Sequence, residues 1–391
     1  MKLTSIHPFP ARMAPEIVFK ELEGLRSPKT ILDPMSGSGT VLRASAELGH
    51  RAIGYDVDPL AVLMSRVWTT PISVDRLRKA AEKLVREAKG VRHERLPWID
   101  NCSETRNYIG FWFRPKQARP LRRLSFVLSR KSGAVSDALR IALSRIIVTK
   151  ERGASVARDT SHSRPHRVFF DNDFDVYKGF LQSVSRLAER LRPEGLRNSV
   201  VVIRGDARKL QELLPNSVDV IITSPPYLNA IDYFRGHRLS LVWLGYRIPQ
   251  IRRFRSGSIG TENGRTRNLT SEKLKKLLRG AGDIEKLPAR ELGMVKRYAQ
   301  DVLGFLQELV RVAKKGAKLL LVVGNSQLKR VAISNARINI VAAKMVGFEL
   351  VRKRERELCT SSRYLPPPSS FGSVSLSRRM RTETLLTFSA A

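Results

Sequence analysis

The chain has 391 residues, 42% of them hydrophobic, which is enough for one large domain with insertions or for two domains. No apolar run reaches the roughly 18–20 residues needed to span a bilayer, and Met1 to Pro10 lack a signal-peptide pattern. The only cysteines, Cys102 and Cys359, cannot form a metal site unaided, and they fit a reducing cytosol. We therefore expect a cytoplasmic protein, and its formal net charge of +35, from 71 basic and 36 acidic residues, favours a nucleic-acid partner over a merely basic composition.

The first 89 residues alternate between strand and helix patterns. The expected elements are a strand at 30–32 that ends at Asp33, a helix at 41–48, a strand at 51–55 that ends at Asp56, and helices at 60–67 and 74–88. A glycine-rich turn joins the first strand to the first helix. This order predicts a parallel βαβ unit.

Two basic insertions interrupt the rest of the pattern. Residues 90 to about 170 show no strand alternation, and helices are expected there at 115–130 and 135–147. Strands resume at 200–203 and 218–222, and a second basic insertion follows at 235–291. A helix at 294–313 and strands at 318–323, 348–352 and 384–388 complete a sheet of about seven strands.

The glycine-rich turn reads DPMSGSGT over residues 33–40. Glycines there let the backbone turn tightly and approach a ligand, and the amides of the following helix favour polar or anionic groups. The turn lacks the Lys-Ser/Thr ending of a phosphate loop and departs from the dinucleotide fingerprint. By itself it is also compatible with a purely structural turn.

Acidic residues follow the second and third strands of the expected sheet. A carboxylate about 20 residues after the glycines can accept hydrogen bonds from both ribose hydroxyls, so we assign Asp56 to a ribose. Asp58 is assigned to capping the helix that starts near Leu60. Asp206 is expected either to bind an adenine amino group or to cap a helix.

A hydrophobic strand runs directly into two prolines and an aromatic residue, since residues 218–227 read VDVIITSPPY. The prolines fix the backbone and leave carbonyls without a local N–H competitor. The Ser224 hydroxyl and the Pro225 carbonyl would accept the two N–H bonds of a planar amine, and Tyr227 would stack on its ring.

These motifs resemble those of the DNA amino-methyltransferases, the N4-cytosine and N6-adenine family. Ser224-Pro225-Pro226-Tyr227 has the Ser form typical of the N4-cytosine enzymes, whereas N6-adenine enzymes more often have Asp or Asn first. The segment 7–12, HPFPAR, resembles the motif that closes over the methionine end of the cofactor. The resemblance implies a Rossmann-like class I methyltransferase fold, α/β with a mostly parallel sheet and helices on both faces.

The resemblance also implies S-adenosylmethionine as the cofactor, S-adenosylhomocysteine as a product, and no metal. By position, Asp33 would face the methionine amino group, Asp56 the ribose and Asp206 the adenine, while Gly37 and Gly39 would provide room for the backbone. The full set of expected cofactor contacts is Phe9, Asp33, Met35, Gly37, Gly39, Thr40, Asp56 and Asp206. Met35 stands where the family usually has Phe, which affects affinity more than identity.

The implied reaction is direct transfer to a base flipped out of duplex DNA, without a covalent enzyme–base intermediate. Flipping costs on the order of a few kcal/mol of unstacking, and positioning provides much of the rate. Methylation of adenine N6, methylation of an RNA base amine, and a catalytically inactive DNA-binding protein are the alternatives. A cognate restriction endonuclease is a further possible partner.

The insertions supply the expected DNA contacts, which are Arg152, Arg158, Arg164, Arg235, Arg238, Arg252, Arg253 and Arg255. Solvated loops are the alternative for both segments, and either insertion could read the DNA sequence. Phe111, Trp112 and Phe113 are expected in a local core, with stacking on bases as the alternative. The expected division is 1–89 for the N-terminal motif and cofactor half, 90–199 for the first insertion, 200–234 for the catalytic half, 235–293 for the second insertion and 294–391 for the end of the sheet.

Overall fold

A computed structural model of the chain describes residues 3–10, 12–150, 152–158, 165–168, 170–191, 200–228, 232–261, 270–358 and 382–391. Arg164, one of the expected DNA contacts, lies outside these residues, as does Cys359. None of the helices in these ranges is long and apolar enough to cross a membrane.

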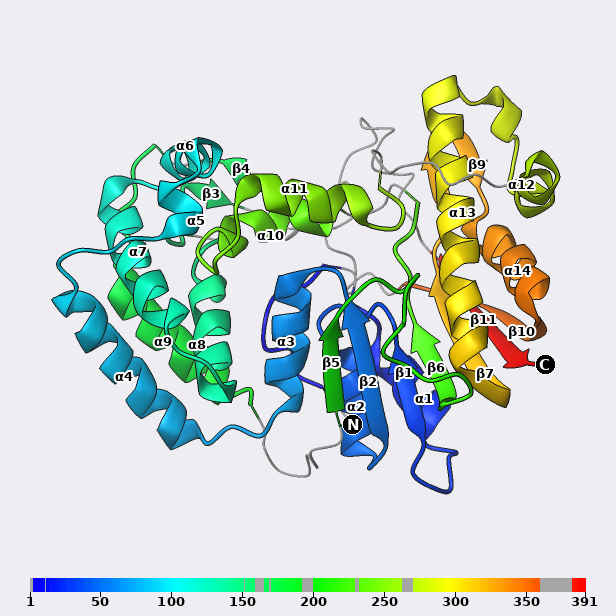
Figure 1. The fold of residues 1–391 in the computed structure, drawn as a ribbon, viewed down its shortest axis with the longest axis horizontal. Coiled ribbons are helices and arrows are strands. Elements are labelled where there is room, and N and C mark those ends of the chain that lie inside the picture. The colour runs from blue at the N-terminus through cyan, green and yellow to red at the C-terminus, as the bar shows by residue number, and fades with distance from the viewer. Residues whose placement is uncertain are drawn as a thin grey trace.

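Seven strands form one sheet in the order β10-β11-β7-β6-β1-β2-β5 (Figure 1). The strands are β1 (Thr30–Asp33), β2 (Arg51–Asp56), β5 (Val200–Arg204), β6 (Val218–Thr223), β7 (Ala313–Val323), β10 (Phe348–Glu357) and β11 (Thr382–Ala390). β11 is antiparallel to both of its neighbours, and the other pairings are parallel. This arrangement is the Rossmann-like class I methyltransferase fold, which confirms the predicted fold class.

Helices cover both faces of the sheet. One face packs against α1 (Pro15–Leu22), α2 (Thr40–Glu47) and α3 (Pro59–Thr69), and the other against α12 (Ser271–Leu278), α13 (Ala289–Val312) and α14 (Asn335–Val346). Successive residues of a strand serve opposite faces, so Val220 and Ile222 belong to the first core and Ile221 to the second. Because both faces are buried, the central strands read as continuous apolar runs without a polar alternation.

A helical lobe stands beside the sheet, on the left in Figure 1. It contains α4 (Val74–Gly90), α5 (Pro97–Asp100), α6 (Ser103–Trp112), α7 (Pro115–Ser129), α8 (Ala134–Arg145) and α9 (Val176–Ala188), with the hairpin β3 (Ala157–Arg158) and β4 (His166–Arg167). α4 packs against α7, α8 and α9. The lobe therefore starts near Val74, whereas the sequence-based division places residues up to 89 with the cofactor half.

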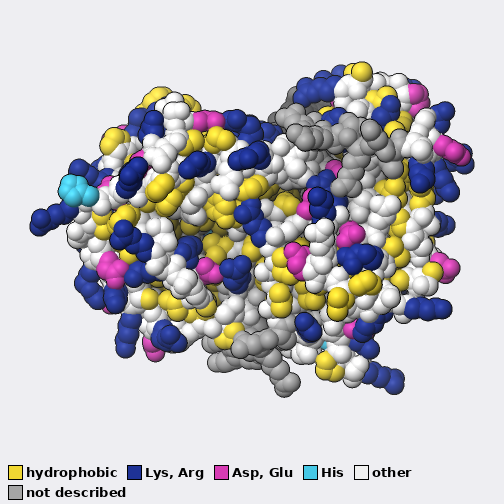
Figure 2. All heavy atoms as spheres, viewed as in Figure 1, with side chains coloured by type: hydrophobic (Ala, Val, Ile, Leu, Met, Phe, Trp, Pro, Cys, Tyr) yellow, Lys and Arg dark blue, Asp and Glu magenta, His cyan; other side chains and the backbone are white. Residues whose placement is uncertain are grey.

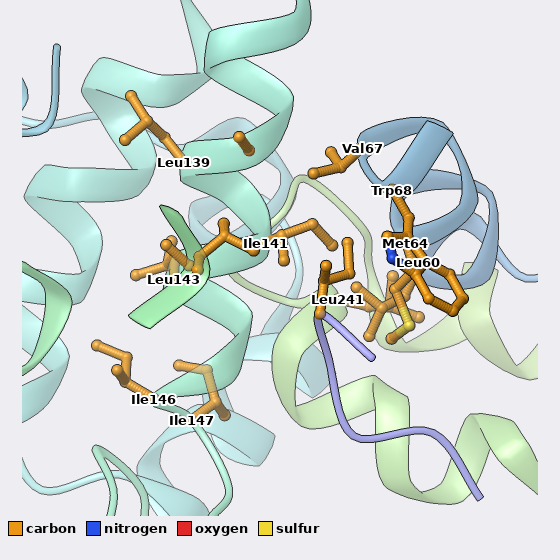
Figure 3. Close-up of a cluster of buried hydrophobic side chains, with 14 of the residues drawn as sticks. Leu60, Met64, Val67, Trp68, Leu139, Ile141, Leu143, Ile146, Ile147 and Leu241 are labelled. Atoms are coloured by element: carbon orange, nitrogen blue, oxygen red, sulfur yellow. The ribbon is translucent and has the colours of Figure 1, made fainter. Parts of the chain in front are cut away.

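The helical lobe and the sheet share one hydrophobic core. Figure 3 shows Leu60, Met64 and Trp68 of α3 facing side chains of α8, with Leu241 of α10 (Tyr233–Leu241) between them. Ile141 of α8 lies in the middle of this contact and is fully buried. The lobe is therefore not a separately packed unit.

The second basic insertion divides between the two halves of the molecule. α10 and α11 (Ile248–Gly257) contact the lobe through α6 and α8, and α10 also contacts α3. The later part, α12 and the short 3-10 helix η1 (Ile284–Lys286), packs on the sheet side with α13, α14 and the hairpin β8 (Ser326–Leu328) and β9 (Val331–Ile333). In Figure 1, α10 and α11 cross above the carboxyl ends of the central strands.

Because the core is shared, Ile141→Ala should destabilise lobe and sheet together. The expected loss in the free energy of unfolding is about 2–5 kcal/mol, with a single cooperative transition in urea followed by both circular dichroism and tryptophan fluorescence. Leu214→Ala, at a side chain 76% exposed, is the control and should shift stability by less than about 0.5 kcal/mol. Two separate transitions for the Ile141 variant would contradict the shared core.

Candidate active site

A cavity of about 220 Å³ opens at the carboxyl ends of β1, β2, β5 and β6. It collects most of the residues predicted from the motifs: Phe9, Asp33, Met35, Gly37, Thr40, Asp56, Asp206, Ser224, Pro226 and Tyr227 all line it. Gly39 and Pro225 belong to the same loops but are not part of the lining. In open α/β sheets, ligands bind at this edge, where the strand order reverses.

The turn after β1 requires glycine at two positions. Gly37 and Gly39 have φ values of +51° and +90°. A Cβ at Gly39 would lie 2.9 Å from the Ser65 Cα of α3, and one at Gly37 would lie 2.9 Å from the Phe9 ring. The Ser65 hydroxyl also donates to the Gly37 carbonyl at 2.9 Å. The turn is therefore held tightly between α3 and the N-terminal segment, and Phe9 is brought into the cavity wall.

Three hydroxyl groups in the cavity wall have no hydrogen-bond partner among the described residues. Ser36, Ser38 and Thr40 are buried and line the cavity. Within the described parts of the chain, none of their oxygens makes a hydrogen bond. Buried polar atoms almost always have a partner in folded proteins, so these three are suited to the polar groups of a bound ligand.

Two carboxyl groups lie deep in the same wall. Asp33 accepts a hydrogen bond from the Met35 N–H at 3.2 Å, and Asp56 accepts from the N–H groups of Gly37 and Asp58, each at 2.9 Å. Burial, together with repulsion from the Asp56 carboxylate, raises the pKa of Asp33 to about 7. Burial and the nearby Asp58 charge raise the pKa of Asp56 to about 7 as well. The pair therefore favours a ligand that carries positive charge or donates hydrogen bonds.

Asp58, between β2 and α3, connects this part of the site to α10 in the second insertion. One of its oxygens accepts from the Leu60 N–H at 2.9 Å, which confirms its predicted role as the cap of α3. The other lies 2.5 Å from His237 Nδ1 on α10. Phe9 packs between these parts, 5.1 Å from the Tyr233 ring at an interplanar angle of 20°. His237 therefore packs against Asp58.

Asp206 lines the cavity in contact with an arginine that sequence analysis missed. Arg208 donates its backbone N–H to Asp206 at 2.9 Å and forms an ion pair with it at 2.6 Å. The same guanidinium reaches Asp301 of α13 at 2.5 Å. No spacing rule connects residues 208 and 301, so only the packing of α13 on the sheet reveals this network. The adenine contact of Asp206 remains a prediction.

The Ser-Pro-Pro-Tyr loop places two hydroxyl groups near each other. Ser224 Oγ lies 3.4 Å from the Tyr227 hydroxyl, which donates to Glu383 Oε1 of β11 at 3.3 Å. Burial and the Glu383 charge hold the pKa of Tyr227 well above its usual value, so the phenol is neutral at physiological pH. Glu383 was not among the predicted residues, because it lies 156 residues further along the chain.

The arginines predicted to bind DNA occupy three kinds of position. Arg235 and Arg255 line the cavity, and Arg255 pairs with Asp232 at 2.6 Å. The Arg238 guanidinium lies 5.4 Å from the centre of the Tyr108 ring. The other four lie on the surface. Arg252 pairs with Glu104, and Arg253 is exposed. Arg152 pairs with Asp173 at 3.1 Å, and Arg158 donates to the Lys150 carbonyl at 2.8 Å. Figure 2 shows Lys and Arg side chains spread over both halves of one face.

The aromatic run at the end of α6 is only partly a core. Trp112 and Phe113 are buried as predicted. The prediction is wrong for Phe111, which is 51% exposed because it lies on the outer side of α6. The Arg167 guanidinium lies 5.2 Å from the centre of the Phe111 ring.

The sequence is similar to type II methyltransferases, although no protein-family model matches the chain. It is 27% identical to M.MvaI of Kocuria varians over 265 residues, which cover 62% of this chain and 57% of that protein. It is 24% identical to M.AvaI of Nostoc sp. strain PCC 7120 over 372 residues, 83% of this chain and 74% of that one. The chain spans just over half the length of M.MvaI, and at these identities the comparison shows similarity alone.

One solved structure shows a weaker likeness. The rRNA methyltransferase aviRa of Streptomyces viridochromogenes covers 98% of this chain and 88% of its own, with 13% sequence identity and a TM-score of 0.34. A likeness at that level carries no conclusion about substrate.

The raised pKa values of Asp33 and Asp56 make the stability of the ligand-free protein depend on pH. Both groups bind protons more tightly in the folded chain than in the unfolded one, where the ordinary value is 3.8. The stability they contribute is therefore complete below about pH 4 and is lost as the pH rises through about 7. Thermal unfolding should show Tm falling between about pH 4 and pH 7, and falling less in Asp33→Asn.

Asp137→Asn is the control, because Asp137 is a half-buried carboxylate that pairs with Arg66 and Arg140 and does not line the cavity. It should keep the wild-type dependence of Tm on pH. An Asp33→Asn variant with an unchanged dependence would contradict the raised pKa.

Proposed function

We propose that the protein is an S-adenosylmethionine-dependent DNA methyltransferase that methylates the exocyclic N4 of a cytosine flipped out of the duplex. One observation carries the proposal: the glycine turn and the Ser-Pro-Pro-Tyr loop open onto the same cavity. A donor site beside a site for a planar amine is what direct methyl transfer requires. The similarity to type II methyltransferases supports DNA as the substrate, and a cognate restriction endonuclease is a further proposed partner.

The cavity residues fit S-adenosylmethionine, which supplies an electrophilic methyl group and a sulfide leaving group when bound. Asp33 would hold the methionine ammonium and Asp56 the ribose hydroxyls, where their carboxylates already lie in the wall. The partnerless hydroxyls of Ser36, Ser38 and Thr40 are available to the same ligand. Phe9 and Met35 provide apolar contact, and Gly37 and Gly39 keep the turn close.

The catalytic loop holds and orients the target amine. Its two N–H bonds would be accepted by Ser224 Oγ and the Pro225 carbonyl, while the Tyr227 ring stacks on the base. These bonds favour a pyramidal nitrogen, so that its lone pair points at the methyl group. No enzyme–base bond is needed. Arg235 and Arg255, at the cavity rim, would contact the phosphates of the flipped nucleotide.

The nature of the product tests the proposal directly. Purified protein incubated with duplex DNA and labelled S-adenosylmethionine should produce N4-methylcytosine on nucleoside analysis. The leading Ser224 favours this product, whereas N6-methyladenine would move the specificity to adenine. Label found only on RNA would refute the DNA substrate.

Ser224→Ala should lower kcat by about 100-fold or more, because loss of one hydrogen-bonding group at a reacting centre has an effect of that order. Cofactor binding, measured by calorimetry, should stay close to wild type. Ser217→Ala, at an exposed hydroxyl on the loop before β6, is the matched control and should retain full activity. Full activity of the Ser224 variant would exclude its proposed role.

We also infer that the first insertion contributes the surface that contacts the DNA bases. Phe111 and Phe170 are 51% and 83% exposed, with the Arg167 guanidinium 5.2 Å and 5.9 Å from their rings. Buried Asn172 donates to the carbonyls of Gly153 and Ser155 and so fixes the loop beside Phe170. Exposed aromatic rings next to a guanidinium suit stacking on bases and contact with phosphates. Arg152 and Arg158 lie in the same region.

Phe170→Ala should weaken binding to the target duplex by about 10-fold, since a base–aromatic stack contributes about 1–3 kcal/mol. The salt dependence of DNA binding by this variant should match that of the wild type. Arg158→Ala should weaken binding to all duplexes alike and reduce the salt slope by about 1. Fluorescence anisotropy at several salt concentrations measures both. Wild-type affinity in both variants would place recognition in the second insertion.

A further inference from the structure

The Ser-Pro-Pro-Tyr loop is joined to the far edge of the sheet by a series of polar contacts. Ser224 Oγ lies 3.4 Å from the Tyr227 hydroxyl, and that hydroxyl donates to Glu383 Oε1 at 3.3 Å. The other Glu383 oxygen lies 3.6 Å from Arg356 Nη1 on β10, directly across the strand pair. Arg356 in turn bonds Glu16 of α1 at 2.6 Å. Three elements distant in sequence therefore meet behind the catalytic loop.

The chemistry of these groups determines which of them donates and which accepts in each hydrogen bond. An ionised carboxylate only accepts hydrogen bonds, whereas a hydroxyl has one proton to donate. Because Tyr227 donates its proton to Glu383, its oxygen can only accept from Ser224. Ser224 then directs its single proton toward Tyr227, and its lone pairs remain for a donor in the cavity.

We propose that Glu383 is a positioning residue that sets the direction of the hydrogen bonds through Tyr227 to Ser224, so that Ser224 Oγ accepts from the target amine. The inference rests on the proposed function, in which Ser224 must accept an amine N–H. Without the carboxylate, Ser224 could donate to the amine nitrogen instead, which would occupy the lone pair that attacks the methyl group. Tyr227 thus has a second role besides stacking on the base: because it donates to Glu383, its oxygen accepts the hydrogen bond from Ser224.

The groups around Glu383 determine the pH at which it is ionised. Burial raises the pKa of Glu383, Arg356 on β10 and the bond from Tyr227 lower it, and Glu16 of α1 raises it slightly. The net direction is upward from 4.5. Below that raised pKa the carboxyl group is protonated and can itself donate to Tyr227. kcat should therefore fall as the pH falls through this range.

The decisive variants are Glu383→Gln and Tyr227→Phe. The Gln amide has the shape of the carboxyl group but can donate, and Phe keeps the ring while it removes the hydroxyl. Each should lower kcat by about 10- to 100-fold, the effect of a hydrogen bond to a charged group, with KM for the cofactor unchanged. The double variant should lose no more than either single one, because both break the same series of bonds.

Glu355→Gln is the matched control. It removes an exposed carboxylate from the same strand pair, one position along β10 from Arg356 and opposite Thr384, and should retain wild-type kcat. Glu383→Gln should also keep the wild-type Tm to within a few degrees and should lose the acidic limb of the pH profile of kcat, measured at saturating cofactor and DNA. A structural role alone would lower Tm and leave that limb in place.

The outcomes separate this inference from the proposed function. Glu383→Gln with kcat within twofold of wild type, or additive losses in the double variant, would overturn the positioning role. A wild-type protein that transfers no methyl group to any DNA would instead refute the proposed function itself.

Discussion

The parallel pairing of β1 with β6 holds the two halves of the candidate site together. Ile31 lies opposite Val220 and Leu32 opposite Ile221, although each pair is separated by 189 residues along the chain. Because parallel strands end at the same edge of a sheet, the turn after β1 and the loop after β6 must open side by side. Every contact between a donor bound by the first loop and a base held by the second depends on this register.

The cavity wall is left with polar groups that the protein does not satisfy by itself. Burial raises the pKa of both Asp33 and Asp56, and Ser36, Ser38 and Thr40 have buried oxygens without partners in the described parts of the chain. Such groups lower the stability of the empty protein. A ligand with an ammonium group and ribose hydroxyls would relieve them, so the same features that weaken the empty fold favour binding.

The helical lobe is integrated with the sheet and its helices because the two parts share one hydrophobic core. α8 packs on α3, and α3 begins at Asp58, whose carboxylate also contacts His237 of α10. The lobe, the residues after β2 and α10 are thus joined by one continuous series of contacts. The exposed Phe111 and Phe170 lie on the part of the lobe formed by α6 and the β3–β4 hairpin.

Local sequence determined the strands, the turns and the chemistry of the two main motifs. Thr30–Asp33 and Val218–Thr223 are apolar runs that end in residues with few backbone options, so strand, loop and sheet edge follow from neighbouring residues alone. The cap at Asp58 and the need for glycine at 37 and 39 could be inferred in the same way. The α/β fold follows from the order of these elements.

Only the tertiary structure decided the partners that come from distant parts of the chain. Arg208 meets Asp301, His237 meets Asp58, and Glu383 meets Tyr227, each across about 90 residues or more. No periodicity or spacing encodes such contacts, because they depend on how helices and strands pack in three dimensions. The exposure of Phe111 beside buried Trp112 and Phe113 was decided in the same way, by which side of α6 faces its neighbours.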